Sequence, residues 1–194
     1  FLPFHFACSV HGDCMTSIFG WEDLDTDESL PVASPEVLRL IPPFHAERDA
    51  KCLVILPNAV FDEIMRQLKE DCSTERIGML IGYPCTRPST EQLLVYVDAA
   101  LPVDDRYATR TKVSIQKNGW TEVWKDLVLT SGTRIVGWYH SHPNHGVFLS
   151  AVDRTTQSLW FAQEWKVAIV VDPIRGEHQA FTGANGIATP MVFV

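Results

Sequence analysis

The chain has 194 residues, of which 46% are hydrophobic, and this length suits one domain with a full core. Its formal net charge is −8 and its isoelectric point is near 5.3, which argues against the basic stripe of a nucleic-acid-binding surface. No apolar run approaches the roughly 20 residues of a membrane-spanning helix, so we expect neither a nucleic-acid partner nor a membrane.

Residues 1–48 are predicted to form an extension ahead of one folded domain at residues 49–194. They carry an acidic cluster at residues 22–28 and four prolines after it, and neither helical nor strand periodicity is clear. We expect one short helix at residues 35–41, because Pro35 suits the first turn of a helix.

Cysteine usage favours a reducing compartment. The five cysteines are odd in number and irregularly spaced, which is not typical of a disulfide framework, so we expect a cytoplasmic protein. Two of them belong to an N-terminal run of alternating histidine and cysteine. The run is cramped for a zinc finger, and we favour an apolar arm over a second metal site there. The run and the remaining cysteines are His5, Cys8, His11, Cys14, Cys52, Cys72 and Cys85.

Strands and helices interleave from residue 52 to the end of the chain. Residues 52–56 form an apolar run typical of a strand, and Pro57 then opens a helix with a 3.6-residue apolar period. Such interleaving predicts a mixed sheet covered by helices, in the α/β (mixed α+β) class. Further strands are predicted at residues 75–83, 92–97, 112–115, 133–139 and 166–171, helices at residues 120–127 and 150–163, and short strands after residue 173.

Two histidines follow the strand predicted at residues 133–139. His140 and His142 lie on one side of the chain if the backbone stays extended, because side chains on a strand repeat every two residues. With Asp153 they make two imidazoles and a carboxylate, a normal ligand set for a catalytic zinc ion that keeps one position open for water. The pattern therefore indicates a metal-dependent hydrolase.

Ser150 and Asp153 also have a structural interpretation. Ser-Ala-Val-Asp has the form of a capping box, in which the serine caps a helix and the carboxylate bonds back to the backbone. We favour the ligand role for Asp153 because it follows the H-x-H pair at this spacing in the sequence. The Ser150 hydroxyl is then close to the metal, where it can stabilise a developing oxyanion by about 3 kcal/mol.

The same residues resemble a known family. They read H-S-H-P-x6-S-x2-D, preceded by G-W-Y, which is similar to the JAMM (MPN+) metalloprotease motif of an upstream glutamate followed by H-[ST]-H-x7-S-x2-D. The resemblance extends over roughly residues 50–182. The flanking runs that resemble the isopeptidases of the proteasome lid and the signalosome are residues 136–143, 147–150 and 167–173.

The resemblance implies a fold and a set of roles. The expected fold is a curved mixed sheet flanked by helices, similar to the layered architecture of cytidine deaminases. One zinc ion per chain would be held by His140, His142 and Asp153. A glutamate at the start of the strand after the first helix would act as general base, and Glu75 matches that context; the competing carboxylates are Glu63, Glu70 and Asp71.

Substrate and partners follow from the resemblance alone. It implies hydrolysis of the bond after the C-terminal tail of ubiquitin or a ubiquitin-like protein, with adenylating and conjugating enzymes of the same pathway as further partners. Trp138 and His145 are candidates to line the substrate cleft. The compact chain resembles prokaryotic members, which favours a bacterial conjugation operon. The alternatives are a peptidase that acts on small peptides or sulfur-carrier proteins, and a non-catalytic MPN scaffold.

Overall fold

The structure is a computed structural model that describes residues 29–41, 50–88, 90–103, 108–109, 112–113 and 134–194. The acidic cluster, the histidine–cysteine run, the helix predicted at residues 120–127 and the boundary predicted near residue 48 lie outside these residues. Within the described part of the chain, no helix is long and apolar enough to cross a membrane.

Eight strands form one mixed sheet in the order β10-β1-β3-β2-β6-β7-β8-β9. The pairs β1–β10, β1–β3 and β6–β7 are parallel, and the other neighbours are antiparallel. In the described part of the chain, two short strands, β4 and β5, form a separate two-stranded sheet. The strands are β1 (Cys52–Leu56), β2 (Ile77–Thr86), β3 (Leu93–Pro102), β4 (Ala108–Thr109), β5 (Lys112–Val113), β6 (Arg134–Ser141), β7 (Val167–Asp172), β8 (Glu177–Thr182), β9 (Ile187–Thr189) and β10 (Met191–Phe193).

The sheet curves until it almost closes on itself. Its two outermost strands, β9 and β10, are separated in the sequence only by Pro190, whose carbonyl accepts a hydrogen bond from the N–H of Val54 in β1 at 3.0 Å. The chain thus leaves one end of the sheet and immediately pairs with the other end. This architecture confirms the prediction of a curved mixed sheet flanked by helices.

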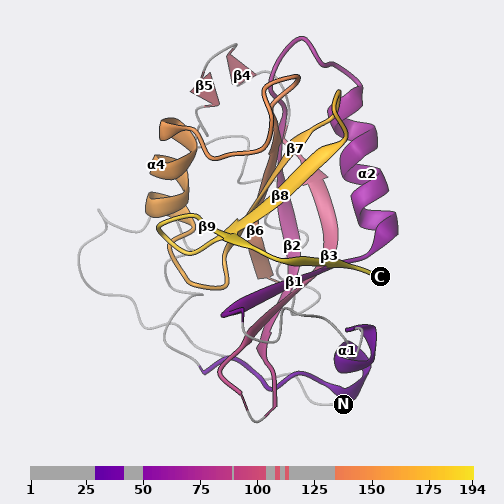
Figure 1. Cartoon of the computed structure of the whole chain (residues 1–194), viewed down its shortest axis with the longest axis vertical. Coiled ribbons are helices and arrows are strands. Elements are labelled where there is room, and N and C mark those ends of the chain that lie inside the picture. The colour runs from indigo at the N-terminus through magenta and orange to yellow at the C-terminus, as the bar shows by residue number, and fades with distance from the viewer. Residues whose placement is uncertain (1–28, 42–49, 89, 104–107, 110–111, 114–133) are drawn as a thin grey trace, which may run out of the picture.

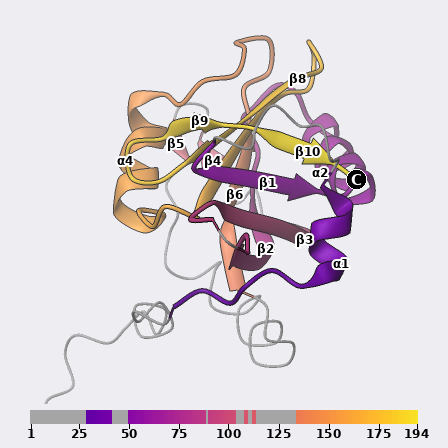
Figure 2. The ribbon, with the colours of Figure 1, turned by 60° about the horizontal axis from the view of Figure 1, so that its bottom comes forward.

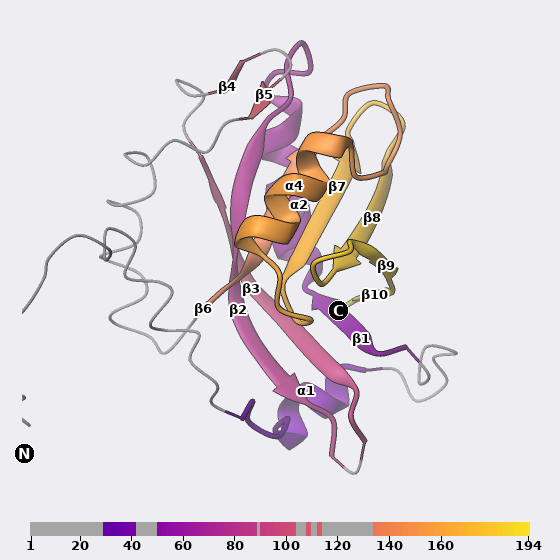
Figure 3. The ribbon, with the colours of Figure 1, turned by 90° about the vertical axis from the view of Figure 1, so that its left-hand side faces the viewer.

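Within the described residues, three helices lie against the sheet. Helices α2 (Asn58–Lys69) and α4 (Ala151–Trp160) lie on opposite sides of it, as Figures 1 and 3 show. Helix α1 (Pro35–Leu40) lies beside β1 and β3 (Figure 2), where Val37 and Leu38 pack against buried residues of both strands. Helix α2 buries Ile64 and Leu68 in the apolar cluster on its side of the sheet, whereas the buried residues of α4 are the polar Asp153 and Gln157.

Most elements predicted within the described residues are present, although some begin or end at other residues than predicted. The strand at residues 52–56 and the helix after it are confirmed. The strand predicted from residue 75 begins only at Ile77, where its regular pairing with His140 of β6 begins. Strand β3 continues to Pro102 because it stays paired with β2 beyond its apolar stretch.

Candidate metal centre

Strand β6 places successive side chains on opposite faces of the sheet. Tyr139 belongs to the apolar cluster under α2, whereas Trp138 belongs to the cluster on the α4 side. His140 lies on the Trp138 side, where the two rings stack with centroids 4.4 Å apart and an angle of 11° between their planes. His140 is only 1% exposed, so its imidazole is fixed by packing.

His142 follows the last residue of β6 and remains attached to the sheet. Its N–H donates to the Val171 carbonyl of β7 at 2.9 Å, which keeps the backbone extended through both histidines. Its ring lies beside that of His140, with centroids 4.8 Å apart, and beside the half-exposed Phe148 at the same centroid distance. The extended backbone thus brings both imidazoles to one side.

The capping box at the start of α4 brings Asp153 to the histidines. The Ser150 N–H donates to Oδ2 of Asp153 at 2.7 Å, and the Asp153 N–H donates to the Ser150 hydroxyl at 3.2 Å. The same Oδ2 lies 3.4 Å from Nε2 of His140 and 3.4 Å from Nε2 of His142. Capping and approach to the histidines are therefore compatible roles of one carboxylate.

One potential ligand atom from each of His140, His142 and Asp153 lies within 4.8 Å of the other two. All three residues are buried. Both ring nitrogens of His140 and Nδ1 of His142 have no hydrogen-bond partner within the described residues. Buried imidazole nitrogens normally have a partner, and a metal ion is one that fits two histidines and a carboxylate.

The charges at this centre depend on each other. Burial would raise the pKa of Asp153, but its contacts with His140 and His142 hold that pKa well below the usual range. Burial also lowers the pKa of His142, whereas Asp153 and the negative charge of Glu75 raise it, with a net upward shift. An ionised carboxylate at this position is ready to bind a cation.

Glu75 lies at the edge of the centre. Its Oε1 atom is 3.8 Å from Nε2 of His142, and its side chain is 33% exposed, whereas the histidines are closed off from solvent. A carboxylate in this position can reach both the centre and the water outside it.

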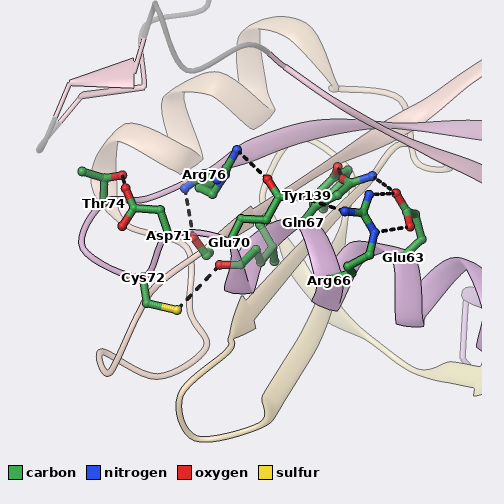
Figure 4. A network of polar contacts seen from close by, with 11 residues as sticks. Glu63, Arg66, Gln67, Glu70, Asp71, Cys72, Thr74, Arg76 and Tyr139 are labelled. Carbon is green, nitrogen blue, oxygen red and sulfur yellow. Dashed lines mark hydrogen bonds and ion pairs between the residues drawn. The ribbon is translucent and has the colours of Figure 1, made fainter.

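The competing carboxylates are engaged elsewhere, as Figure 4 shows. Glu63 bonds to Arg66 at 2.6 Å, and Glu70 bonds to the same guanidinium at 2.8 Å. The Asp71 carboxylate accepts bonds from the backbone and hydroxyl of Ser73. Among the four carboxylates considered as general base, only Glu75 contacts a histidine of the centre within the described residues.

The two residues expected to line the substrate cleft differ in exposure. Trp138 is 2% exposed and stacks on His140, and its indole N–H donates to Oε1 of Gln157 at 2.8 Å. His145 is exposed on the loop between β6 and α4. Gln157 was not identified from the sequence, because a glutamine in an amphipathic helix does not indicate that it orients a distant aromatic ring.

Asp172 was also not identified, although it orders the loop that follows the histidines. Its fully buried carboxylate accepts hydrogen bonds from four backbone N–H groups at 2.9 to 3.1 Å. Burial opposes ionisation, but these bonds lower the pKa of Asp172 to about 2. The donors are Asn144, Gly146, Ile174 and Arg175.

We expect Asp172→Asn to destabilise the protein by about 2 kcal/mol, because an amide cannot accept bonds through both of its ends. Because folding lowers the pKa of Asp172, its ionised carboxylate adds to the free energy of unfolding at pH values above 3.8, the ordinary pKa. This contribution is lost as the pH falls through about 2. The difference in unfolding free energy between wild type and variant should therefore reach its largest value above pH 4 and become smaller below that pH. Denaturant titrations from pH 7 to pH 2 measure it, and a constant difference would contradict the assignment.

The sequence is similar to a known protein family and to proteins of several organisms. A family model described as prokaryotic homologs of the JAB domain matches residues 57–181, more than half of the chain. COP9 signalosome complex subunit 5 of Eremothecium gossypii is 36% identical over 117 residues, which cover 59% of this chain and 26% of that protein. The Caenorhabditis elegans subunit 5 is 36% identical over 111 residues, covering 55% and 28%. The chain thus spans about a quarter of the length of these relatives.

A solved structure has the same fold. The solution structure of a protein from Desulfitobacterium hafniense aligns with a TM-score of 0.57 and covers 73% of this chain and 92% of that one. Because the two sequences are only 18% identical, this likeness concerns the fold alone.

Proposed function

The chain belongs to the family of prokaryotic homologs of the JAB domain, and we propose that it is a zinc-dependent hydrolase that cleaves the bond after the C-terminal tail of a ubiquitin-like protein. One observation carries the proposal. His140, His142 and Asp153 converge within 4.8 Å of one another, and Glu75 lies 3.8 Å from the second histidine. This arrangement supports a metallohydrolase with an adjacent general base.

The residues present fit one zinc ion per chain. Two neutral imidazoles and one carboxylate are ligands that zinc accepts, and the buried imidazole nitrogens without partners lie at this centre. A bound zinc ion would supply Lewis acidity and lower the pKa of a water molecule to about 7. Trp138 and the capping box would keep His140 and Asp153 in place for binding.

Glu75 and Ser150 would carry out the proton transfer and the charge stabilisation. The partly exposed Glu75 carboxylate accepts a proton from the attacking water and delivers it to the leaving amine. The Ser150 hydroxyl accepts a bond from the Asp153 N–H, which leaves its own hydrogen to donate to the oxyanion of the scissile carbonyl. We propose that the exposed His145 contacts the substrate, while Trp138 stacks on the His140 ring and holds it in place.

The substrate class rests on the resemblance to JAMM isopeptidases and on the relatives described above. We propose a ubiquitin-like protein or its conjugate as partner, with adenylating and conjugating enzymes of the same cytoplasmic pathway. A non-catalytic scaffold would not need the intact ligand set that the fold brings together here.

The direct test is cleavage of a ubiquitin-like tail fused through its terminal glycine to a reporter. We expect the wild type to cut the fusion, a chelator to abolish cutting, and added zinc to restore it. A fusion that lacks the two terminal tail residues is the matched control and should remain intact. A protein that binds one zinc ion but cuts no tail fusion would contradict the proposed substrate, and cutting that resists chelation would contradict the metal-dependent mechanism.

A further inference from the structure

We propose that the Ser141 hydroxyl, between the two histidines, is a positioning group that fixes Glu75 for proton transfer. The inference rests on the proposed function, because it takes Glu75 as the general base. Ser141 is buried with 0% exposure, so its hydroxyl faces the protein interior and not the substrate. Its effect on the reaction must therefore pass through another residue.

The contact partner of Ser141 is the residue that follows Glu75. The Ser141 N–H donates to the Arg76 carbonyl at 2.9 Å, and the Arg76 N–H donates to the Ser141 hydroxyl at 2.9 Å. Two residues of a regular antiparallel pair would exchange both bonds through their carbonyls. Here the side-chain oxygen takes the place of the second carbonyl.

This exchange extends the sheet by one residue beyond its regular pairing. The ladder between β2 and β6 ends at the pair Ile77–His140, and Arg76 and Ser141 are the next residues on each strand. Without the hydroxyl, only one of the two bonds would remain, and the part-buried N–H of Arg76 would lose its partner. An alanine at this position would therefore loosen the backbone next to Glu75.

The residues before and after Glu75 in the sequence make polar contacts that restrict its backbone. The Arg76 guanidinium lies 3.4 Å from Glu70, which also bonds to Arg66 of α2 at 2.8 Å (Figure 4). On the other side, the Asp71 carboxylate holds the turn that ends at Thr74. Glu75 thus lies between a hydrogen-bonded turn and the hydrogen-bonded Arg76, and its Oε1 atom is 3.8 Å from Nε2 of His142.

The proposal predicts a specific kinetic pattern for Ser141→Ala. We expect kcat on the tail–reporter fusion to fall about 30-fold, because small displacements of a reacting group can cost up to a hundredfold. KM should stay within twofold and the zinc content at one ion per chain, since neither substrate nor metal touches the hydroxyl. The amide of Arg76 should exchange with solvent faster, as followed by NMR.

Two variants complete the test. Ser141→Thr keeps the hydroxyl and should restore kcat and slow exchange at Arg76. Ser158→Ala removes an exposed hydroxyl of α4 that, among the described residues, donates to the Thr155 carbonyl, and it should leave kcat unchanged. An unchanged kcat in Ser141→Ala, or a loss caused by lower zinc content or higher KM, would overturn the proposal. If the wild type cut no fusion, the proposed function would fail, and the exchange rate of Arg76 alone would decide whether the hydroxyl holds this backbone.

Discussion

Glu75→Gln is expected to lower kcat by about a thousandfold while the protein keeps its zinc. General base catalysis typically contributes 10²- to 10⁴-fold, and an amide cannot accept the proton. The side chain is 33% exposed and lies 3.8 Å from His142, so an isosteric amide should fit without disturbing the three ligands. Steady-state kinetics on the tail–reporter fusion, with zinc measured on the same sample, separates loss of the base from loss of the metal.

Glu63→Gln is the matched control for this experiment. It makes the same chemical change on α2, at a carboxylate that pairs with Arg66 and, within the described residues, contacts none of His140, His142 and Asp153. We expect its kcat to stay within twofold of wild type. Activity in Glu75→Gln at the wild-type level would show that another group takes the proton, and loss of zinc in that variant would show that Glu75 supports the ligands.

The convergence of His140, His142 and Asp153 was predictable because these residues are close in sequence and belong to simple local structures. Extended backbone places His140 and His142 on one side, and the Ser-x-x-Asp pattern places Asp153 in the first turn of a helix. Both rules act over a few residues, so no tertiary information was needed. The mixed sheet covered by helices was predictable for a similar reason, since its strands and the helices α2 and α4 have clear periodicity, whereas its curvature was expected from the family resemblance.

The contacts that support the site could not be predicted because they join residues far apart in the sequence. Arg76 and Ser141 are 65 residues apart, and no fixed spacing relates Glu75 to the histidines. Asp172 looks like the end of an apolar strand, and only the fold shows the four N–H groups around its carboxylate. Pairing between strands also decided where β2 begins and β3 ends, which apolar patterning alone misplaced.

Asp153→Asn is expected to lose zinc and activity together while the metal-free protein still folds with helix α4 capped. Changes in residues that only support metal ligands typically cost 10- to 100-fold in metal affinity, so loss of a direct ligand should cost more than a hundredfold. The amide oxygen can still accept the bond from the Ser150 N–H, now 2.7 Å from Oδ2, so the helix start should survive. Zinc titration against a competing chelator, and thermal unfolding without metal, measure the two effects separately.

Ser150→Ala is expected to lower stability and kcat but not zinc affinity. It therefore separates the capping role of the Ser150–Asp153 pair from the ligand role of Asp153. It removes the bond to the Asp153 N–H, which should cost about 1 kcal/mol of stability, but leaves the three ligands in place. Zinc affinity should stay near that of wild type, while kcat falls by about a hundredfold through loss of the oxyanion donor. If Asp153→Asn instead kept its zinc and lost only stability, Asp153 would be a capping residue alone, and the metal would have to be held by His140, His142 and a different third ligand.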